Sequence, residues 1–143
     1  MFLGTFEHSI DEKSRFTIPA KFREDLSDGL VITAGVDPCL LLYPKKEWSA
    51  LAAKVSALPL TSAEGREFGR QLFASAADDV PDKQGRVTVP IFLLSYAGID
   101  KSATIVGQNT YCEIWDTEAW KERRDRMHRD PEGRAAMFAS LGI

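Results

Sequence analysis

Apolar and polar residues alternate at the start of the chain. Phe6, His8 and Ile10 alternate with polar residues over positions 5–10, which is the period of a β-strand. A polar segment follows at 11–14, and residues 16–18 resume a β-forming run. The pattern predicts a β-hairpin with the segment 11–15 at its tip.

Helical spacing of apolar residues appears later in the first half. Pro19 ends the strand and can begin a short helix over 20–26. An amphipathic helix is predicted over 44–58, where Pro59 stops it, and the capping box at 61–64 begins another helix. Two strands precede these helices, at 30–34 and 40–43.

The second half repeats this order less clearly. Its first strand is poorly defined, because residues 73–80 are rich in Ala and Asp. The later elements are predicted as strands at 86–89, 104–106 and 111–115, a helix at 117–129 stopped by Asp130-Pro131, and a final short helix at 135–141.

The chain contains the same nine-residue motif twice. Residues 11–19 read D-E-K-S-R-F-T-I-P and residues 82–90 read D-K-Q-G-R-V-T-V-P, so both fit D-x-x-x-R-φ-T-φ-P with φ apolar. Further matches are Phe22 with Phe92, Trp48 with Trp120, and the E-G-R triplets at 64–66 and 132–134. Repetition of this kind indicates a tandem duplication of a unit of about 70 residues.

The duplication divides the chain into four segments. We expect a first repeat at 5–47, a helical connector at 48–75, a second repeat at 76–119 and C-terminal helices at 120–143. A unit of about 70 residues buries only a marginal core alone. The two halves are therefore expected to pack on each other or on partner chains.

Composition and charge narrow the range of functions. The 143 residues are 44% hydrophobic, as in a soluble globular protein, and no apolar run is long enough for a membrane span. The formal net charge is −3 and the pI about 5.4, which argues against a simple basic nucleic-acid binder. Cys39 and Cys112 lie in apolar runs without zinc spacing, so we expect small buried side chains in a reducing, cytoplasmic protein with no signal peptide and no cofactor.

The motif also has a chemical interpretation. An Asp at the start of a turn accepts backbone N–H bonds and can hold an Arg four residues later by a charge-assisted pair. An arginine held in this way can grip a phosphate or a guanine edge, and a lysine stands in each tip. The plainer alternative is that the Asp–Arg pair only closes each hairpin.

The doubled motif, the opening M-F-x-G-x-F and the total length closely resemble the bacterial MraZ family. The resemblance covers essentially the whole chain. It implies a mainly β fold with appended helices (α+β), in which two swapped-hairpin repeats of the AbrB and SpoVT type form a β-barrel and each is followed by helices. It also implies a nucleoid-associated, ring-shaped homo-oligomer that regulates transcription of the division and cell-wall gene cluster by binding short G-rich direct repeats in double-stranded promoter DNA.

Site residues follow from the motif positions. We expect Arg15 and Arg86 to contact bases or phosphates, with phosphate contacts from Lys13 and Lys83. The arginine-orienting residues would be Asp11 and Asp82. Because each tip offers only two or three cations, a ring that presents many tips to repeated sites would gain affinity through avidity.

Three other features have competing interpretations. The basic stretch at 121–129 is either a second DNA surface, a subunit contact or the solvated face of a helix, and Trp48 and Trp120 fit core positions better than stacking platforms. Only two histidines occur, without any catalytic motif, which argues against an enzyme. A ring-forming assembly or protein-interaction module without DNA recognition stays open as the alternative function.

Overall fold

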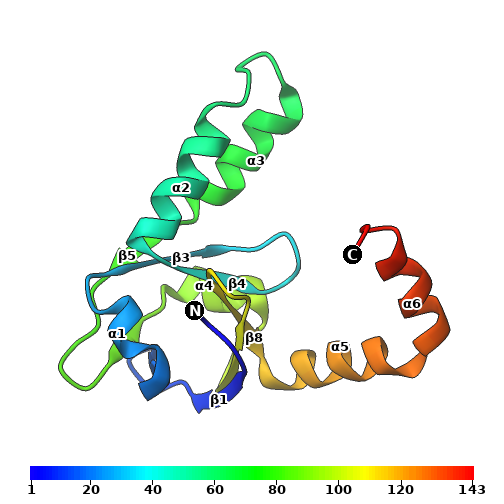
Figure 1. Cartoon of the computed structure of the whole chain (residues 1–143). Coiled ribbons are helices and arrows are strands. Elements are labelled where there is room, and N and C mark those ends of the chain that lie inside the picture. Colours follow the sequence, from blue (N-terminus) through cyan, green and yellow to red (C-terminus); the bar gives the residue numbers. More distant parts are fainter.

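The structure is a computed structural model that describes all 143 residues. It has eight strands and six α-helices, and Figure 1 shows the strands gathered in one body from which two pairs of helices project. The strands are β1 (Thr5–Ser9), β2 (Arg15–Thr17), β3 (Leu30–Ala34), β4 (Leu40–Pro44), β5 (Ala77–Asp79), β6 (Arg86–Thr88), β7 (Ser102–Gly107) and β8 (Cys112–Asp116). The helices are a 3-10 turn (Ala20–Phe22), α1 (Arg23–Leu26), α2 (Lys45–Ser56), α3 (Ala63–Ala74), α4 (Ile91–Ala97), α5 (Thr117–Arg129) and α6 (Pro131–Ala139). None of them combines the length and apolar character that a membrane span requires.

The sheets interleave the two repeats. The main antiparallel sheet has the order β1-β7-β8-β4-β3-β5, and a separate two-stranded sheet joins β2 to β6. When each strand of the main sheet is exchanged for its counterpart in the other repeat (β1 for β5, β3 for β7, β4 for β8), the same order results, read from the opposite edge. At the centre of this symmetry Leu42 pairs with Cys112 and Leu40 with Ile114. The tandem duplication is therefore present in the structure as a pseudo-two-fold arrangement.

The predicted local hairpin is wrong. β1 does not pair with β2: it pairs with β7 of the second repeat, while β2 pairs with β6. Of the predicted hairpin, only the turn between β1 and β2 is present. In the second repeat β5 does not pair with β6 either, but with β3 of the first repeat. Strands this short form no stable pair by themselves, whereas exchange between repeats places both halves around one core.

The apolar positions of the motif lie in that core. Phe16, Ile18, Val87 and Val89 are fully buried in a cluster of 20 residues that draws on both repeats. Phe22 packs edge-on against Phe2 and Phe6 in the same cluster. The alternation R-φ-T-φ thus directs the φ residues inward and leaves the Arg and Thr positions outside.

Three details of the sequence interpretation need correction. Phe92 is 56% exposed, and the counterpart of buried Phe22 is Leu93, which is 0% exposed on the inner face of α4. Helix α3 is capped by Ser62, whose hydroxyl accepts from Gly65 N, rather than by Thr61. Pro131 does not merely stop α5, because it begins α6 at the first helical position with Asp130 as the N-cap.

The two repeats differ most in their helix pairs (Figure 1). Residues 57–62 let α3 return beside α2 and reach the sheet, where Thr33 Oγ1 donates to Leu72 O. In the second repeat Asp130 alone separates α5 from α6, and α6 turns away at an elbow without burying any residue. Both repeat tryptophans are half-buried, with ring centroids 6.1 Å from Tyr43 and 6.0 Å from Trp115 respectively.

Candidate nucleic-acid interface

The two motif turns share one backbone geometry. In the first, Ser14 N donates to Asp11 O at 3.0 Å and Asp11 N donates to Arg15 O at 2.9 Å. In the second, Gly85 N donates to Asp82 O at 2.9 Å and Asp82 N to Arg86 O at 3.0 Å. This is a three-residue loop whose last residue adopts the left-handed conformation, with φ of 59° at Ser14 and 78° at Gly85.

The aspartates hold the arginines in the same way in both turns. Asp11 Oδ1 accepts from Lys13 N and Arg15 N, both at 2.9 Å, and Oδ2 accepts from Arg15 Nε at 2.8 Å. Asp82 makes the equivalent bonds at 2.9, 2.9 and 2.7 Å. The backbone N–H of the arginine, more than its side chain, holds the pKa of each aspartate below its ordinary value.

Each arginine keeps free donors despite this pairing. Only the Nε of Arg15 and of Arg86 is engaged, so both Nη groups of each guanidinium lack a hydrogen bond or ion pair within the chain. The Nη groups of a guanidinium fixed in this way can donate two parallel bonds to a phosphate or to the O6 and N7 of guanine.

Both turns belong to one surface, which we call the tip ribbon: strands β2 and β6 with the turns 11–15 and 82–86. Arg15 pairs with Thr88 and Thr17 with Arg86, while Phe16 and Val87 between them face the core. The outward positions therefore carry two arginines and two threonines on the same face. The two arginines are diagonal neighbours on that face, and such positions are roughly 7–8 Å apart, while each guanidinium is held by the Asp of its own turn.

Two backbone bonds tie the ribbon together. Ile18 N donates to Gly85 O and Val89 N donates to Ser14 O, both at 2.8 Å, so each turn is anchored on the strand of the other repeat. The hypothesis of two separate tips is thereby replaced by one composite ribbon. Lys13 and Lys83 are exposed near its opposite ends.

Arg23 was missed by the sequence interpretation. It lies on α1, donates from Nε to Ile18 O at 3.2 Å, and its side chain lies against Gly85 of the second turn. Its counterpart in the second repeat is apolar Leu94, so the repeat pattern contains no signal for it. It adds a fifth cation beside the ribbon.

The surroundings of the two turns differ in charge. Asp79 Oδ2 accepts from Thr88 N at 3.0 Å, and Thr88 pairs with Arg15 of the first turn. The counterpart of Asp79 is His8, whose pKa is lowered by burial and, to a smaller extent, by the nearby Arg23 charge. His8 is therefore mainly neutral at pH 7, while the additional cation, Arg23, lies against Gly85, so the second turn has the more positive surroundings.

The basic stretch at 121–129 lies elsewhere. In Figure 1 the loop after β5 projects at the lower left, whereas α5 leaves the body at the lower right. Each of its five cations lies within 4.0 Å of an acidic side chain; Arg123, for example, is 3.7 Å from Asp37 and stacks over Trp115 at 5.1 Å. This geometry favours the interpretation of a solvated helix face.

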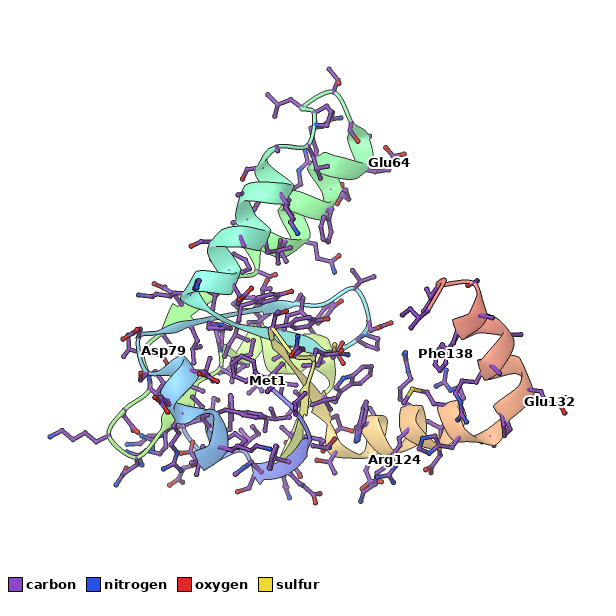
Figure 2. The ribbon with its side chains drawn as sticks, viewed as in Figure 1. Met1, Glu64, Asp79, Arg124, Glu132 and Phe138 are labelled. Carbon is purple, nitrogen blue, oxygen red and sulfur yellow. The ribbon has the colours of Figure 1, made fainter.

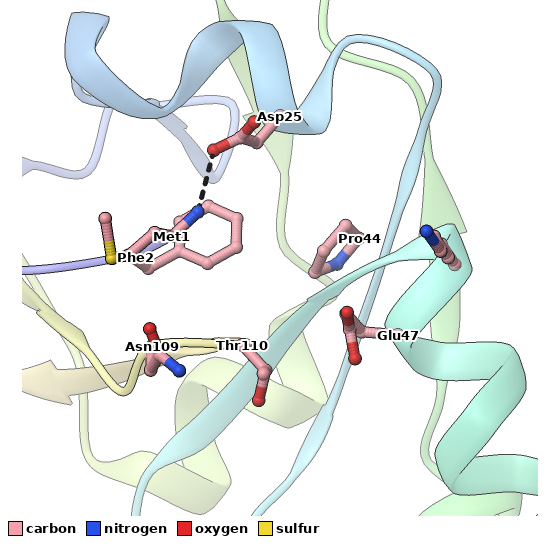
Figure 3. A pocket seen from close by; sticks show the side chains of 8 residues that line it. Met1, Phe2, Asp25, Pro44, Glu47, Asn109 and Thr110 are labelled. Atoms are coloured by element: carbon pink, nitrogen blue, oxygen red, sulfur yellow. Dashed lines mark hydrogen bonds and ion pairs between the residues drawn. The ribbon is translucent and has the colours of Figure 1, made fainter.

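A hollow lies at the N-terminus (Figure 3). It measures about 350 Å3 and lies between the chain start, Asp25, Pro44 and the 109–110 turn. The amino group of Met1 contacts Asp25 Oδ2 at 3.3 Å, and both groups are largely exposed. The hollow contains none of the motif residues.

Ser14 gives a direct test of the turn geometry. Its left-handed conformation costs a non-glycine residue about 1 kcal/mol, and its hydroxyl makes no hydrogen bond. We expect Ser14→Gly to raise the free energy of unfolding by about 0.5–1 kcal/mol in urea denaturation at fixed protein concentration. The matched Gly85→Ala should lower it, because its Cβ would lie 2.6 Å from Arg23 Nε. A less stable Ser14→Gly protein would contradict the turn assignment.

The sequence of the chain is similar to that of known proteins over most or all of its length. One protein-family model matches the chain twice, over residues 1–71 and 72–138, and its description is "MraZ protein, putative antitoxin-like". The chain is 45% identical to the transcriptional regulator MraZ of Syntrophomonas wolfei and 44% identical to that of Herpetosiphon aurantiacus, in both cases over all of both chains. It is 47% identical to the protein of the same name from Micrococcus luteus over 84% of each chain.

Proposed function

The chain belongs to the MraZ family, and we propose that it is a sequence-specific DNA-binding transcriptional regulator that contacts DNA through the tip ribbon. The family is one of transcriptional regulators and not of enzymes. The observation that carries the proposal is the pair of arginines held by Asp11 and Asp82, with their Nη groups free on one outward face.

The shape of the ribbon suits the major groove. A two-stranded antiparallel ribbon fits into that groove, where arginine donates two bonds to guanine. Arg15 and Arg86 would read base edges or phosphates, while Lys13 and Lys83 near the two ends would reach the phosphate backbone. The preference for G-rich sites that the resemblance implies agrees with two arginines on one face.

Assembly belongs to the same proposal. One ribbon offers few cations on a chain with net charge −3, so a single contact would be weak. A ring-shaped homo-oligomer that presents several ribbons to direct repeats would gain affinity by effective concentration. We place its targets in the promoter of the division and cell-wall gene cluster, and the protein at the nucleoid.

An alternative is an assembly or protein-interaction module without DNA recognition. The observation that favours it is the α5–α6 arm, whose second helix exposes apolar side chains. Under this alternative the Asp–Arg pairs would only close the turns. Measurements of DNA binding separate the two functions.

The test compares the promoter DNA of the protein's own gene cluster with a shuffled duplex of equal length. In fluorescence anisotropy at 0.15 M salt we expect promoter binding at least about a thousandfold tighter than binding to the shuffled duplex. Equal affinity for both duplexes, or no binding to either, would contradict the proposal and favour the assembly module.

A further inference from the structure

Helix α6 repeats the sequence of the end of α3. Residues 72–75 read L-F-A-S and residues 137–140 read M-F-A-S, and both helices carry an E-G-R triplet in their first turn, eight residues before the Leu in α3 and five before the Met in α6. In the first repeat Leu72 is buried and Phe73 lies edge-on to Trp48 at 5.9 Å. In the second repeat the matching Met137 and Phe138 are 61% and 47% exposed. The face is therefore covered at Leu72 and uncovered at its match Met137, while Phe73, 38% exposed, differs less from Phe138.

The connection between the helices explains the difference. Residues 57–62 lie between α2 and α3, which is enough chain for a reversal. Between α5 and α6 there is only Asp130, whose side chain caps α6 through Gly133 N at 3.0 Å. Antiparallel helices are joined by loops of at least about two residues. With one residue α6 cannot fold back on its own α5, and Figure 2 shows Phe138 on the inner side of the elbow and Glu132 on the outer side.

Helix α5 has apolar residues at the positions with which α2 contacts α3 in the first repeat. Trp120 and Met127 are the counterparts of Trp48 and Val55, and Val55 is buried where α3 covers α2. Met127, by contrast, is exposed, and it lines a hollow of about 350 Å3 with Met137 and Phe138 at the elbow. The Nε1 of Trp120 is the one buried side-chain polar atom of the chain that lacks a hydrogen-bond partner.

Charge also favours pairing between α5 and an antiparallel α6. The last turn of α5 is basic, with Arg126, His128 and Arg129, and the first turn of α6 carries Glu132. An antiparallel α6 on α5 places the acidic turn beside the basic turn and aligns the helix dipoles favourably.

We propose that α6 of a second copy of this chain packs antiparallel on α5, with its Met137 and Phe138 against Trp120 and Met127, in the manner of α3 on α2. This is a domain swap, and a hinge too short for local closure is a common cause of swapping. The inference names the contact that the proposed ring would use, and it rests on that part of the proposed function.

The first test lengthens the hinge. Residues 57–62 (A-L-P-L-T-S) replace Asp130, which keeps a Ser as the N-cap of α6. Size-exclusion chromatography with light scattering should give a mass of several chains for the wild type, whose single chain is 15.9 kDa, and the mass of one slightly longer chain for this variant, because α6 then closes on its own α5. The same six residues added after Ile143 serve as the control and should leave the number of chains in the assembly unchanged. A wild type that consists of one chain, or a hinge variant with the same number of chains as the wild type, would overturn the inference.

The second test changes the contact itself. Phe138→Asp should lower the mass, while Ile91→Asp, on another exposed apolar site at the start of α4, should not. The reverse result would place the interface at α4 and overturn the inference. Binding of a short single-site duplex, measured alongside, keeps the outcomes distinct: it should survive Phe138→Asp within about threefold, because no ribbon residue is changed. Loss of assembly in Phe138→Asp with DNA binding retained would support this contact. Failure of the wild type to bind DNA would contradict the proposed function instead.

Discussion

Replacement of both Arg15 and Arg86 by alanine is expected to abolish specific DNA binding without changing the fold or the oligomer. Both side chains lie outside the core, and their Nη groups make no bond within the chain. A bidentate arginine–guanine contact contributes roughly 1–3 kcal/mol of discrimination. Loss of two such contacts per protomer should therefore weaken binding to promoter DNA by roughly 30-fold to 20,000-fold. Fluorescence anisotropy with the promoter duplex measures this loss.

The control variant changes two other arginines. Arg124→Ala combined with Arg129→Ala removes the same charge from α5, where both residues lie close to acidic side chains. We expect at most about a threefold loss of affinity, since exposed pairs of this kind contribute little. The same mass and circular dichroism for all three proteins would show that binding alone has changed. Equal binding by the wild type and the Arg15/Arg86 variant would contradict the role of the ribbon.

Asp11→Asn combined with Asp82→Asn is expected to weaken specific binding even though it makes the protein less acidic. The net charge rises from −3 to −1, which by attraction alone would favour DNA. The amide, however, cannot accept from both the backbone N–H groups and Arg Nε as the carboxylate does. We expect roughly tenfold or greater loss for promoter DNA, because charge-assisted bonds are the strong ones, with unchanged or tighter binding to shuffled DNA.

The pH dependence of the wild type provides a control for this variant. The pKa of both aspartates is lowered, chiefly by the backbone N–H of Arg15 and Arg86. A lowered pKa means that the carboxylate form stabilises the turn above the unfolded-state pKa, and that this contribution is lost only as pH falls through the folded pKa. Lowering the pH from 7 to 5 should therefore not reproduce the effect of the two asparagines. Tighter promoter binding by the asparagine variant would show that the aspartates do not position the arginines.

Local sequence patterns predicted the local structure well. The helix predicted at 117–129 is α5, and the strand at 30–34 is β3. The repeated Asp and Arg also located both turns, because the four-residue spacing fixes which side chains meet. The pairing partners of the strands could not be predicted in this way. Whether β1 pairs with β2 or with β7 depends on the burial of both repeats together, and a local pattern does not contain that information.

Similar reasons explain the other errors. Phe92 was matched to Phe22 by residue type, whereas the structure buries Leu93 because it lies on the inner face of α4. Arg23 was overlooked because its position near Gly85 results from packing between the repeats. The elbow between α5 and α6 results from a connection of one residue, Asp130, where α2 and α3 are joined by residues 57–62. The importance of this difference in length depends on how α3 packs beside α2, which a local pattern does not contain.

The most direct test of the central proposal is the salt dependence of promoter binding. The wild type, the Arg15→Ala/Arg86→Ala variant and the Arg124→Ala/Arg129→Ala variant are titrated with the same duplex between 0.05 and 0.3 M salt, where each phosphate contact contributes about 0.9 to the slope of log K against log salt concentration. We predict that the α5 variant follows the wild-type line, and that the ribbon variant binds weakly at every salt concentration with a shallower slope. A ribbon variant that follows the wild type, with the α5 variant losing affinity and slope, would place the DNA surface on α5 and contradict the proposal.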